Sequence, residues 1–173
     1  MNETAPVAAP IIVTALIDDA DFHHFDRLRR AHFPPKRNQL PAHLTMFHHL
    51  MPSLEHELKQ RLSAETRGVP KPAARVGGLL PLGSGVAFRI DSPALEEIRG
   101  RLADAFGPLL TPQDAAGWRP HITVQNKVSA AQAKALLSEL DADFTPRPIA
   151  IAGLASWWYR GGPWAPLSRH MFA

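Results

Sequence analysis

The sequence predicts an α+β protein made of two similar lobes. Apolar runs rich in β-branched residues alternate along the chain with amphipathic helical segments. The order strand, helix, motif strand, helix, strand occurs twice, which indicates an internal structural repeat. With 173 residues and 45% hydrophobic side chains, the chain can bury one sizeable core. We therefore expect a single domain over residues 1–173, with its lobes divided near the Gly-Ser-Gly turn at residues 83–85.

The first half contains five segments in the expected order. Residues 11–17 form a short apolar run typical of a buried strand, and residues 18–32 show helical spacing with acidic residues in the first turn. Pro34 and Pro35 end that helix. The remaining segments are a strand at residues 43–50, a helix that Ser53 caps and a strand at residues 74–82.

The second half repeats this order. A strand is predicted at residues 86–91, and Ser92-Pro93 begins a helix. After a loop at residues 107–117 we expect a strand at about residues 119–127. Ser129 and Gln132 match a capping box and predict the next helix. The chain should close with a hairpin whose strands cover residues 149–159 and 167–172.

A His-x-Thr-x tetrapeptide with apolar x occurs in each predicted motif strand, at residues 43–46 and 121–124. A single copy would be a weak signal, and the repetition in matched settings is the informative feature. On a strand, residues i and i+2 face the same way, about 6.5 Å apart. His43 and Thr45 should therefore share one face, as should His121 and Thr123.

Two imidazoles and two hydroxyls are suited to metal-free acid–base chemistry at a phosphodiester. One neutral imidazole can take a proton from water while a second, protonated imidazole donates to the departing oxygen. Threonine hydroxyls can donate hydrogen bonds to the non-bridging phosphate oxygens. The sequence leaves open which histidine is the acid and which is the base.

The paired motifs in duplicated halves resemble those of the 2H phosphoesterase superfamily, which includes bacterial 2′-5′ RNA ligases and RNA 2′,3′-cyclic phosphodiesterases. The resemblance implies a bilobal fold in which antiparallel sheets line a central cleft and the helices lie outside. It also implies that His43 and His121 are catalytic and that Thr45 and Thr123 bind phosphate.

The resemblance and the chemistry together predict a metal-independent phosphoesterase. Its substrate would be a 2′,3′-cyclic phosphate or a 2′-5′ phosphodiester in RNA or a nucleotide, and the reverse reaction would be 2′-5′ ligation. Two other interpretations stay open. One is a non-catalytic RNA- or nucleotide-binding module, although both histidines and both threonines are present. The other is a hydrolase of a small cyclic-phosphate metabolite, which a narrow cleft with few basic residues would favour.

Four further residues are candidates for substrate binding because they extend or flank the motif strands. Phe47 and Trp118 could stack on a base, Arg119 could contact phosphate, and Gln125 shares the face of His121. Each could equally be a packing or surface residue. A cluster of basic residues at positions 27, 29, 30, 36 and 37 could steer RNA, but we interpret it as a solvated helix face. Tryptophans 157, 158 and 164 are interpreted as packing residues of the final hairpin.

Composition excludes several other classes of protein. The chain contains no cysteine, which rules out disulfides, thiolate metal sites and a cysteine nucleophile. The arrangement of its nine histidines and its carboxylates matches no common metal motif, and we expect neither a metal nor another cofactor. The first ten residues lack the pattern of a signal peptide, and no apolar run is long enough to span a membrane.

We therefore expect a cytoplasmic monomer without membrane contact, whose partners are RNA ends or nucleotides that carry a cyclic or 2′-5′ phosphate. The net charge of +3 agrees with an anionic substrate.

Overall fold

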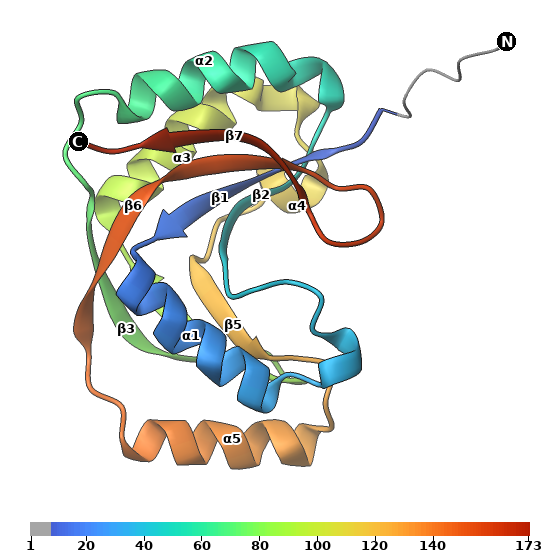
Figure 1. Ribbon diagram of the computed structural model, residues 1–173, viewed down its shortest axis with the longest axis vertical. Helices are drawn as coiled ribbons and strands as arrows, with labels where there is room; N and C mark the ends of the chain where they lie inside the picture. Colours follow the sequence, from blue (N-terminus) through green and yellow to red (C-terminus); the bar gives the residue numbers. More distant parts are fainter. Residues whose placement is uncertain (1–7) are drawn as a thin grey trace, which may run out of the picture.

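A computed structural model describes residues 8–173, which fold as an α+β protein, as predicted (Figure 1). The prediction about a signal peptide concerns residues that lie largely outside this described part. The strands are β1 (Ile11–Ile17), β2 (Leu44–Leu50), β3 (Ala73–Pro81), β4 (Val86–Asp91), β5 (His121–Gln125), β6 (Arg147–Trp158) and β7 (Ala165–Met171). The helices are α1 (Asp19–His32), α2 (Glu55–Thr66), α3 (Pro93–Phe106), α4 (Pro112–Ala115) and α5 (Ala130–Ala142). The order of strands and helices in the two halves is the predicted one with one correction: the segment predicted as a loop at residues 107–117 contains the short helix α4, because Thr111 caps it and Pro112 begins it.

The seven strands form one antiparallel sheet in the order β2-β1-β6-β3-β4-β5, and β7 pairs with β6. The 12-residue strand β6 joins the two parts of the sheet. Its first residues, 147–150, pair with β3, whereas residues 151–158 pair with β1. The order is symmetric about this junction, because β2 and β1 on one side correspond to β5 and β4 on the other.

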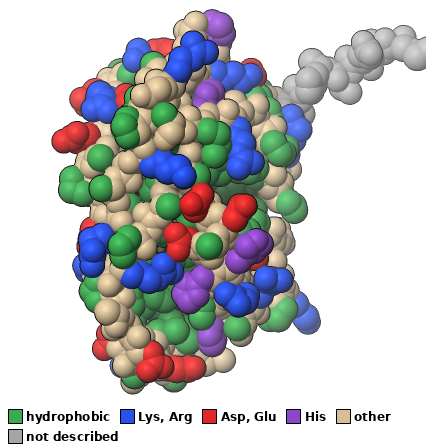
Figure 2. All heavy atoms as spheres, turned by 60° about the vertical axis from the view of Figure 1, so that its left-hand side comes forward, with side chains coloured by type: hydrophobic (Ala, Val, Ile, Leu, Met, Phe, Trp, Pro, Cys, Tyr) green, Lys and Arg blue, Asp and Glu red, His purple; other side chains and the backbone are tan. Residues whose placement is uncertain are grey.

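The helices cover the outside of the curved sheet. In Figure 1, α2 and α3 lie at one end of the molecule and α1 and α5 at the other. The core is continuous between these layers, and Phe25 of α1 packs edge-on against Phe88 of β4 with ring centroids 5.3 Å apart. None of the helices in residues 8–173 is long and apolar enough to cross a membrane. On the face shown in Figure 2, acidic, basic and apolar side chains are interspersed.

Curvature of the sheet brings its two end strands together. β2 and β5 are at opposite ends of the strand order, yet they contact each other and lie close together in Figure 1. These are the two strands that carry the repeated tetrapeptide. The fold therefore brings the two motif strands into contact, although no backbone ladder connects them.

Local predictions succeeded at most helix and strand ends. The hydroxyl of Ser92 accepts from the amide of Leu95, and Ser129 forms the expected capping box with Gln132. The predicted cap at Ser53 is wrong, because residues 52–54 form a 3₁₀ turn and α2 begins at Glu55 without a side-chain cap. The turn of the β3–β4 hairpin lies at residues 83–85, where Gly83 adopts a φ of +83°. The division into lobes at this point stays a prediction.

Candidate active site

The two motif histidines occupy matched positions at the starts of β2 and β5. His43 immediately precedes β2, and His121 is the first residue of β5; both are half-buried. Each ring contacts a backbone carbonyl two residues earlier in the chain. Nδ1 of His43 lies 2.8 Å from the oxygen of Pro41, and Nδ1 of His121 lies 2.6 Å from the oxygen of Arg119.

These contacts define the tautomer of both rings. A carbonyl oxygen can only accept a hydrogen bond, so Nδ1 must carry the proton in each histidine. The other ring nitrogen, Nε2, is then left as an acceptor in the neutral imidazole and becomes a donor when the ring is protonated. Both histidines are thus oriented to exchange a proton through Nε2.

The surroundings of His43 favour its neutral form. Burial lowers the pKa of His43 to about 4, and the positive charges of Arg29 and His121 act in the same direction. The hydrogen bond to Pro41 opposes this shift without reversing it. His43 is therefore unprotonated near neutral pH.

The threonines lie on the predicted faces of their strands. Thr45 and Thr123 are half-buried, whereas their apolar neighbours in the motifs are fully buried on the opposite face; these neighbours are Leu44, Met46, Ile122 and Val124. Thr45 is paired with Thr14 of β1, and Thr123 with Ala87 of β4. The alternation expected from the sequence therefore holds in both motifs.

Two buried arginines connect each motif strand to a helix from the opposite half of the chain. Nη1 of Arg29, in α1, donates to the carbonyl of Thr123 in β5 over 3.1 Å. Nε of Arg99, in α3, donates to the carbonyl of Met46 in β2 over 3.2 Å. Both side chains also stack on an aromatic ring, Arg29 on Phe33 and Arg99 on Phe47. The pair repeats the two-fold symmetry of the motifs.

Two further contacts hold β2 against the segment that leads into β5. The indole Nε1 of Trp118 donates to the carbonyl of Thr45 over 3.0 Å. The carboxylate of Asp114, which is fully buried, accepts from the backbone amides of His48 and His49. These bonds cross between the two motif segments, so they set the distance between them.

A pocket of about 400 Å³ borders His43. Thr14 and Trp157 both line it, and Nε1 of Trp157 donates to the Thr14 hydroxyl over 2.9 Å. Trp164, in the loop between β6 and β7, packs edge-on against the His43 ring with centroids 4.8 Å apart. Arg169 of β7 adds a positive charge. Asp19 of α1 also lines the pocket, which therefore combines aromatic surface with charges of both signs.

The additional candidates from the sequence fall in different environments. Phe47 was expected on the face of His43, but it is fully buried in the core. The reason is a register shift between β1 and β2 at residues 13–14, which interrupts the alternation of the strand. Arg119 is exposed and offers its carbonyl to His121, and Trp118 is partly buried against the core. Gln125 is buried, and its Oε1 has no hydrogen-bond partner among the described residues.

Sequence reasoning missed several residues of this site, and two of them show why. Arg29 was interpreted as part of a solvated surface, which is wrong because only 5% of it is exposed. Its spacing from Phe22 and Phe25 places it on the apolar face of α1, and this was the available signal. Trp164 was interpreted as a packing residue of the final hairpin. Its contact with His43 depends on how the β6–β7 loop folds back, which no local pattern indicated.

No group of three or more potential metal ligands occurs among residues 8–173.

The comparisons with known proteins agree with the geometry. A family model described as the 2′-5′ RNA ligase superfamily matches residues 17–163. No curated protein sequence matches the chain.

Solved structures share the fold at low sequence identity. LigT of E. coli in complex with NADP⁺ is 15% identical, with a TM-score of 0.61 over 95% of this chain and 98% of LigT. TT0787 of Thermus thermophilus is 12% identical, with a TM-score of 0.65 over 94% of this chain and 97% of its own. The complex of LigT with 3′-AMP is 16% identical, with a TM-score of 0.59 over 96% of this chain and 99% of LigT.

Proposed function

The chain belongs to the 2′-5′ RNA ligase superfamily, and on this premise we propose that it is a metal-independent phosphoesterase that opens 2′,3′-cyclic phosphates at RNA ends. The observation that carries the proposal is the matched pair of hydrogen bonds from Nδ1 of His43 and His121 to the carbonyls two residues earlier. The same bond in both halves leaves two Nε2 atoms as the reactive groups. A 2′-5′ phosphodiester is the related substrate. Ligation would be attack on the cyclic phosphate by a ribose 5′-hydroxyl in place of water, which forms a 2′-5′ phosphodiester as the bond from the 3′ oxygen to phosphorus breaks.

In this mechanism His43 is the general base. Its neutral form is favoured near pH 7, because burial lowers its pKa to about 4. An anionic phosphate between the two rings favours protonation and so raises the pKa of the imidazole as the reaction proceeds. Nε2 of His43 takes a proton from water, whose oxygen forms a bond to phosphorus.

His121 is the general acid. Its Nε2–H donates a proton to the 2′ or 3′ ribose oxygen as the bond from that oxygen to phosphorus breaks. The products are a ribose hydroxyl and a phosphate monoester, and the proton taken up by His43 balances the one released by His121. The hydroxyls of Thr45 and Thr123 donate to the non-bridging oxygens, where negative charge increases in the transition state.

The pocket beside His43 is suited to the terminal nucleoside. The rings of Trp157 and Trp164 offer surfaces on which a base can stack, and Arg169 offers a cation. The LigT structures contain nucleotides, NADP⁺ in one and 3′-AMP in another. These ligands support a nucleotide-like substrate for the present chain.

The test is turnover of an RNA oligonucleotide that ends in a 2′,3′-cyclic phosphate, measured in EDTA. We expect wild type to open the ring and both His43→Gln and His121→Gln to lose about 10²-fold or more in kcat. His56→Gln, on the exposed face of α2, is the matched control and should behave as wild type.

Two results would contradict the proposal. One is wild-type turnover that persists in both histidine variants. The other is the absence of turnover by wild type. Binding of the RNA without turnover would favour a non-catalytic binding module, and turnover of only a small cyclic-phosphate compound would favour a metabolite hydrolase.

A further inference from the structure

Three adjoining pockets follow the loop that connects β6 and β7, which we call the 159–164 loop. The first is the pocket beside His43, and Trp164 forms part of its wall. The second, of about 350 Å³, lies against Trp164, Gly161 and Tyr159. The third, of about 580 Å³, shares Tyr159 and Gly161 with the second. Each pocket shares lining residues with the next, and we call this series of neighbouring pockets, which begins at His43, the path.

The second pocket is strongly basic. Arg29, Arg37 and Lys127 line it, and none of the described residues around it is acidic. Lys127 follows directly after β5 and adopts a φ of +62°, a left-handed conformation that few non-glycine residues take. Charges of both signs are interspersed on the face shown in Figure 2, whereas this pocket carries only positive charge. Such a pocket is suited to a phosphate group.

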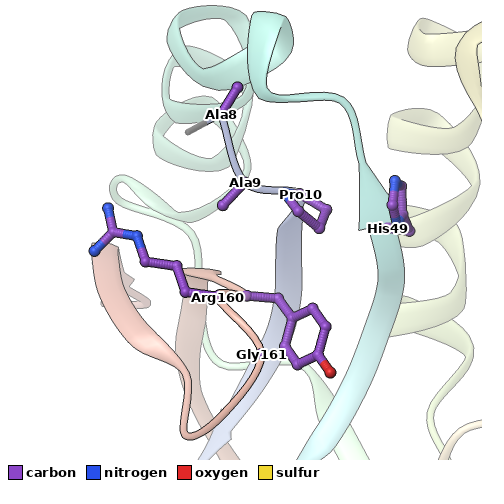
Figure 3. Close-up of a pocket in the computed structure, with 7 residues that line it drawn as sticks. Ala8, Ala9, Pro10, His49, Arg160 and Gly161 are labelled. Atoms are coloured by element: carbon purple, nitrogen blue, oxygen red, sulfur yellow. The ribbon is translucent and has the colours of Figure 1, made fainter. Parts of the chain in front are cut away.

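The third pocket continues the path with a different composition. Figure 3 shows His49, from β2, and the Arg160 side chain on opposite sides of this pocket, with Ala9 and Pro10 on the segment that leads into β1. Tyr159 lies between the second and third pockets and is 45% exposed, which is high for a large aromatic side chain. None of the described residues that line this pocket is acidic either.

Aromatic and basic side chains therefore alternate along the path. Trp164 separates the first pocket from the second, the cations of the second pocket follow, and Tyr159 separates the second pocket from the third. Proteins that hold single-stranded nucleic acids combine a basic groove for the backbone with aromatic rings on which successive bases stack. A mononucleotide would occupy only the first pocket, and a small metabolite would leave the other two unused.

We propose that the three pockets form a track for single-stranded RNA and that the substrate is an oligonucleotide of about three nucleotides or more. The terminal nucleoside lies beside His43, the next phosphate on its 5′ side lies among Arg37, Lys127 and Arg29, and the preceding base stacks on Tyr159. This inference rests on the proposed function, because it identifies the substrate of the same site as a polymer.

The experiment compares RNAs of one to four nucleotides, each ending in a 2′,3′-cyclic phosphate. A mononucleotide with an added 5′-phosphate separates a terminal phosphate from an internucleotide one. We expect kcat/KM to rise at least tenfold from one nucleotide to three and then to level off. The 5′-phosphate alone should recover only part of this gain, since Tyr159 would have no base to stack on.

Variants identify the pockets responsible. Lys127→Asn removes the charge and keeps a residue that tolerates the left-handed conformation, and Tyr159→Ala removes the ring. Both should lower kcat/KM for the trinucleotide at least tenfold more than for the mononucleotide. Lys127→Asn should also reduce the slope of log KM against log salt concentration by about one. Lys134→Gln, on the exposed face of α5, makes the same change of charge away from the path and should match wild type.

A length-independent kcat/KM would overturn the track. If no RNA is turned over, the proposed function fails, but the track can still be tested with unreactive RNAs that end in a 3′-phosphate. Fluorescence anisotropy should then give a Kd that falls with RNA length in wild type. For the same RNA, the Kd of Lys127→Asn should be higher than that of wild type. A Kd that is independent of length, or equal in wild type and Lys127→Asn, would overturn the track independently of catalysis.

Discussion

Arg29 donates a hydrogen bond from Nη1 to the carbonyl of Thr123, 94 positions later in the sequence, over 3.1 Å. The donor lies in α1 and the acceptor is the threonine of the second motif. Because its Nε also donates to the side chain of Asn38, Arg29 ties the segment before His43 to the strand of His121. One buried cation thus connects the two halves of the candidate site.

Arg29→Gln should destabilise the protein by about 2–4 kcal/mol, because the buried carbonyl of Thr123 and the Asn38 side chain lose their charged partner. Urea denaturation at pH 7 measures the free energy of unfolding. Arg27→Gln, on the exposed side of the same helix, should change it by less than about 0.5 kcal/mol. Equal effects in the two variants would show that the contacts of Arg29 contribute nothing specific.

Asp114→Asn should destabilise the protein by about 1–3 kcal/mol. The carboxylate accepts from two backbone amides and from Nδ1 of His48, and an asparagine amide would point a donor at one of these donors. Burial raises the pKa of Asp114, but the hydrogen bonds from His48 and His49 outweigh this, so the pKa lies below its usual value. The contribution of the carboxylate to the free energy of unfolding is therefore present above about pH 4 and is lost as the pH falls further. Urea denaturation at pH 7 and at pH 3 measures the free energy of unfolding of wild type and Asp114→Asn. The difference between the two proteins should be smaller at pH 3 than at pH 7, and an equal difference at both pH values would contradict this account.

His43 should make the stability of the protein depend on pH. Its pKa is about 4 in the folded state and near 6.5 in the unfolded chain, so the unfolded state binds the proton first as the pH falls. The free energy of unfolding should therefore decrease from pH 6.5 to pH 4, by about 2–3 kcal/mol at pH 4.5. Urea denaturation of wild type and His43→Gln at several pH values isolates this contribution. Parallel curves for the two proteins would show that His43 titrates normally.

Trp164→Leu should raise the pKa of His43 from about 4 toward 6.5. The indole packs against the imidazole and helps to bury it, and burial is the largest cause of the low pKa. NMR titration of the histidine ring resonances measures the shift, with Trp158→Leu as a control in the same hairpin. A pKa of His43 that stays near 4 in Trp164→Leu would assign the burial of this ring to other neighbours.

Sequence patterns anticipated the strands and helices because their signals are local. The capping box at Ser129 and the apolar run of β1 depend on residues within a few positions of each other, and both appear as expected. The cap at Ser53 failed because a competing 3₁₀ turn moved the start of α2. The prediction that Phe47 shares the face of His43 was wrong for a related reason, because a register shift between β1 and β2 places its side chain in the core.

The sequence by itself determined the α+β class, the repeated order of elements and the face shared by His43 and Thr45, and by His121 and Thr123. These follow from periodicity, which a chain shows without its partners. The tertiary structure alone decided that β2 and β5, the two ends of the strand order, contact each other, that Arg29 is buried and that Trp164 packs against His43. Each of these depends on contacts between residues far apart in the chain, and only the packing of the whole molecule brings such residues together.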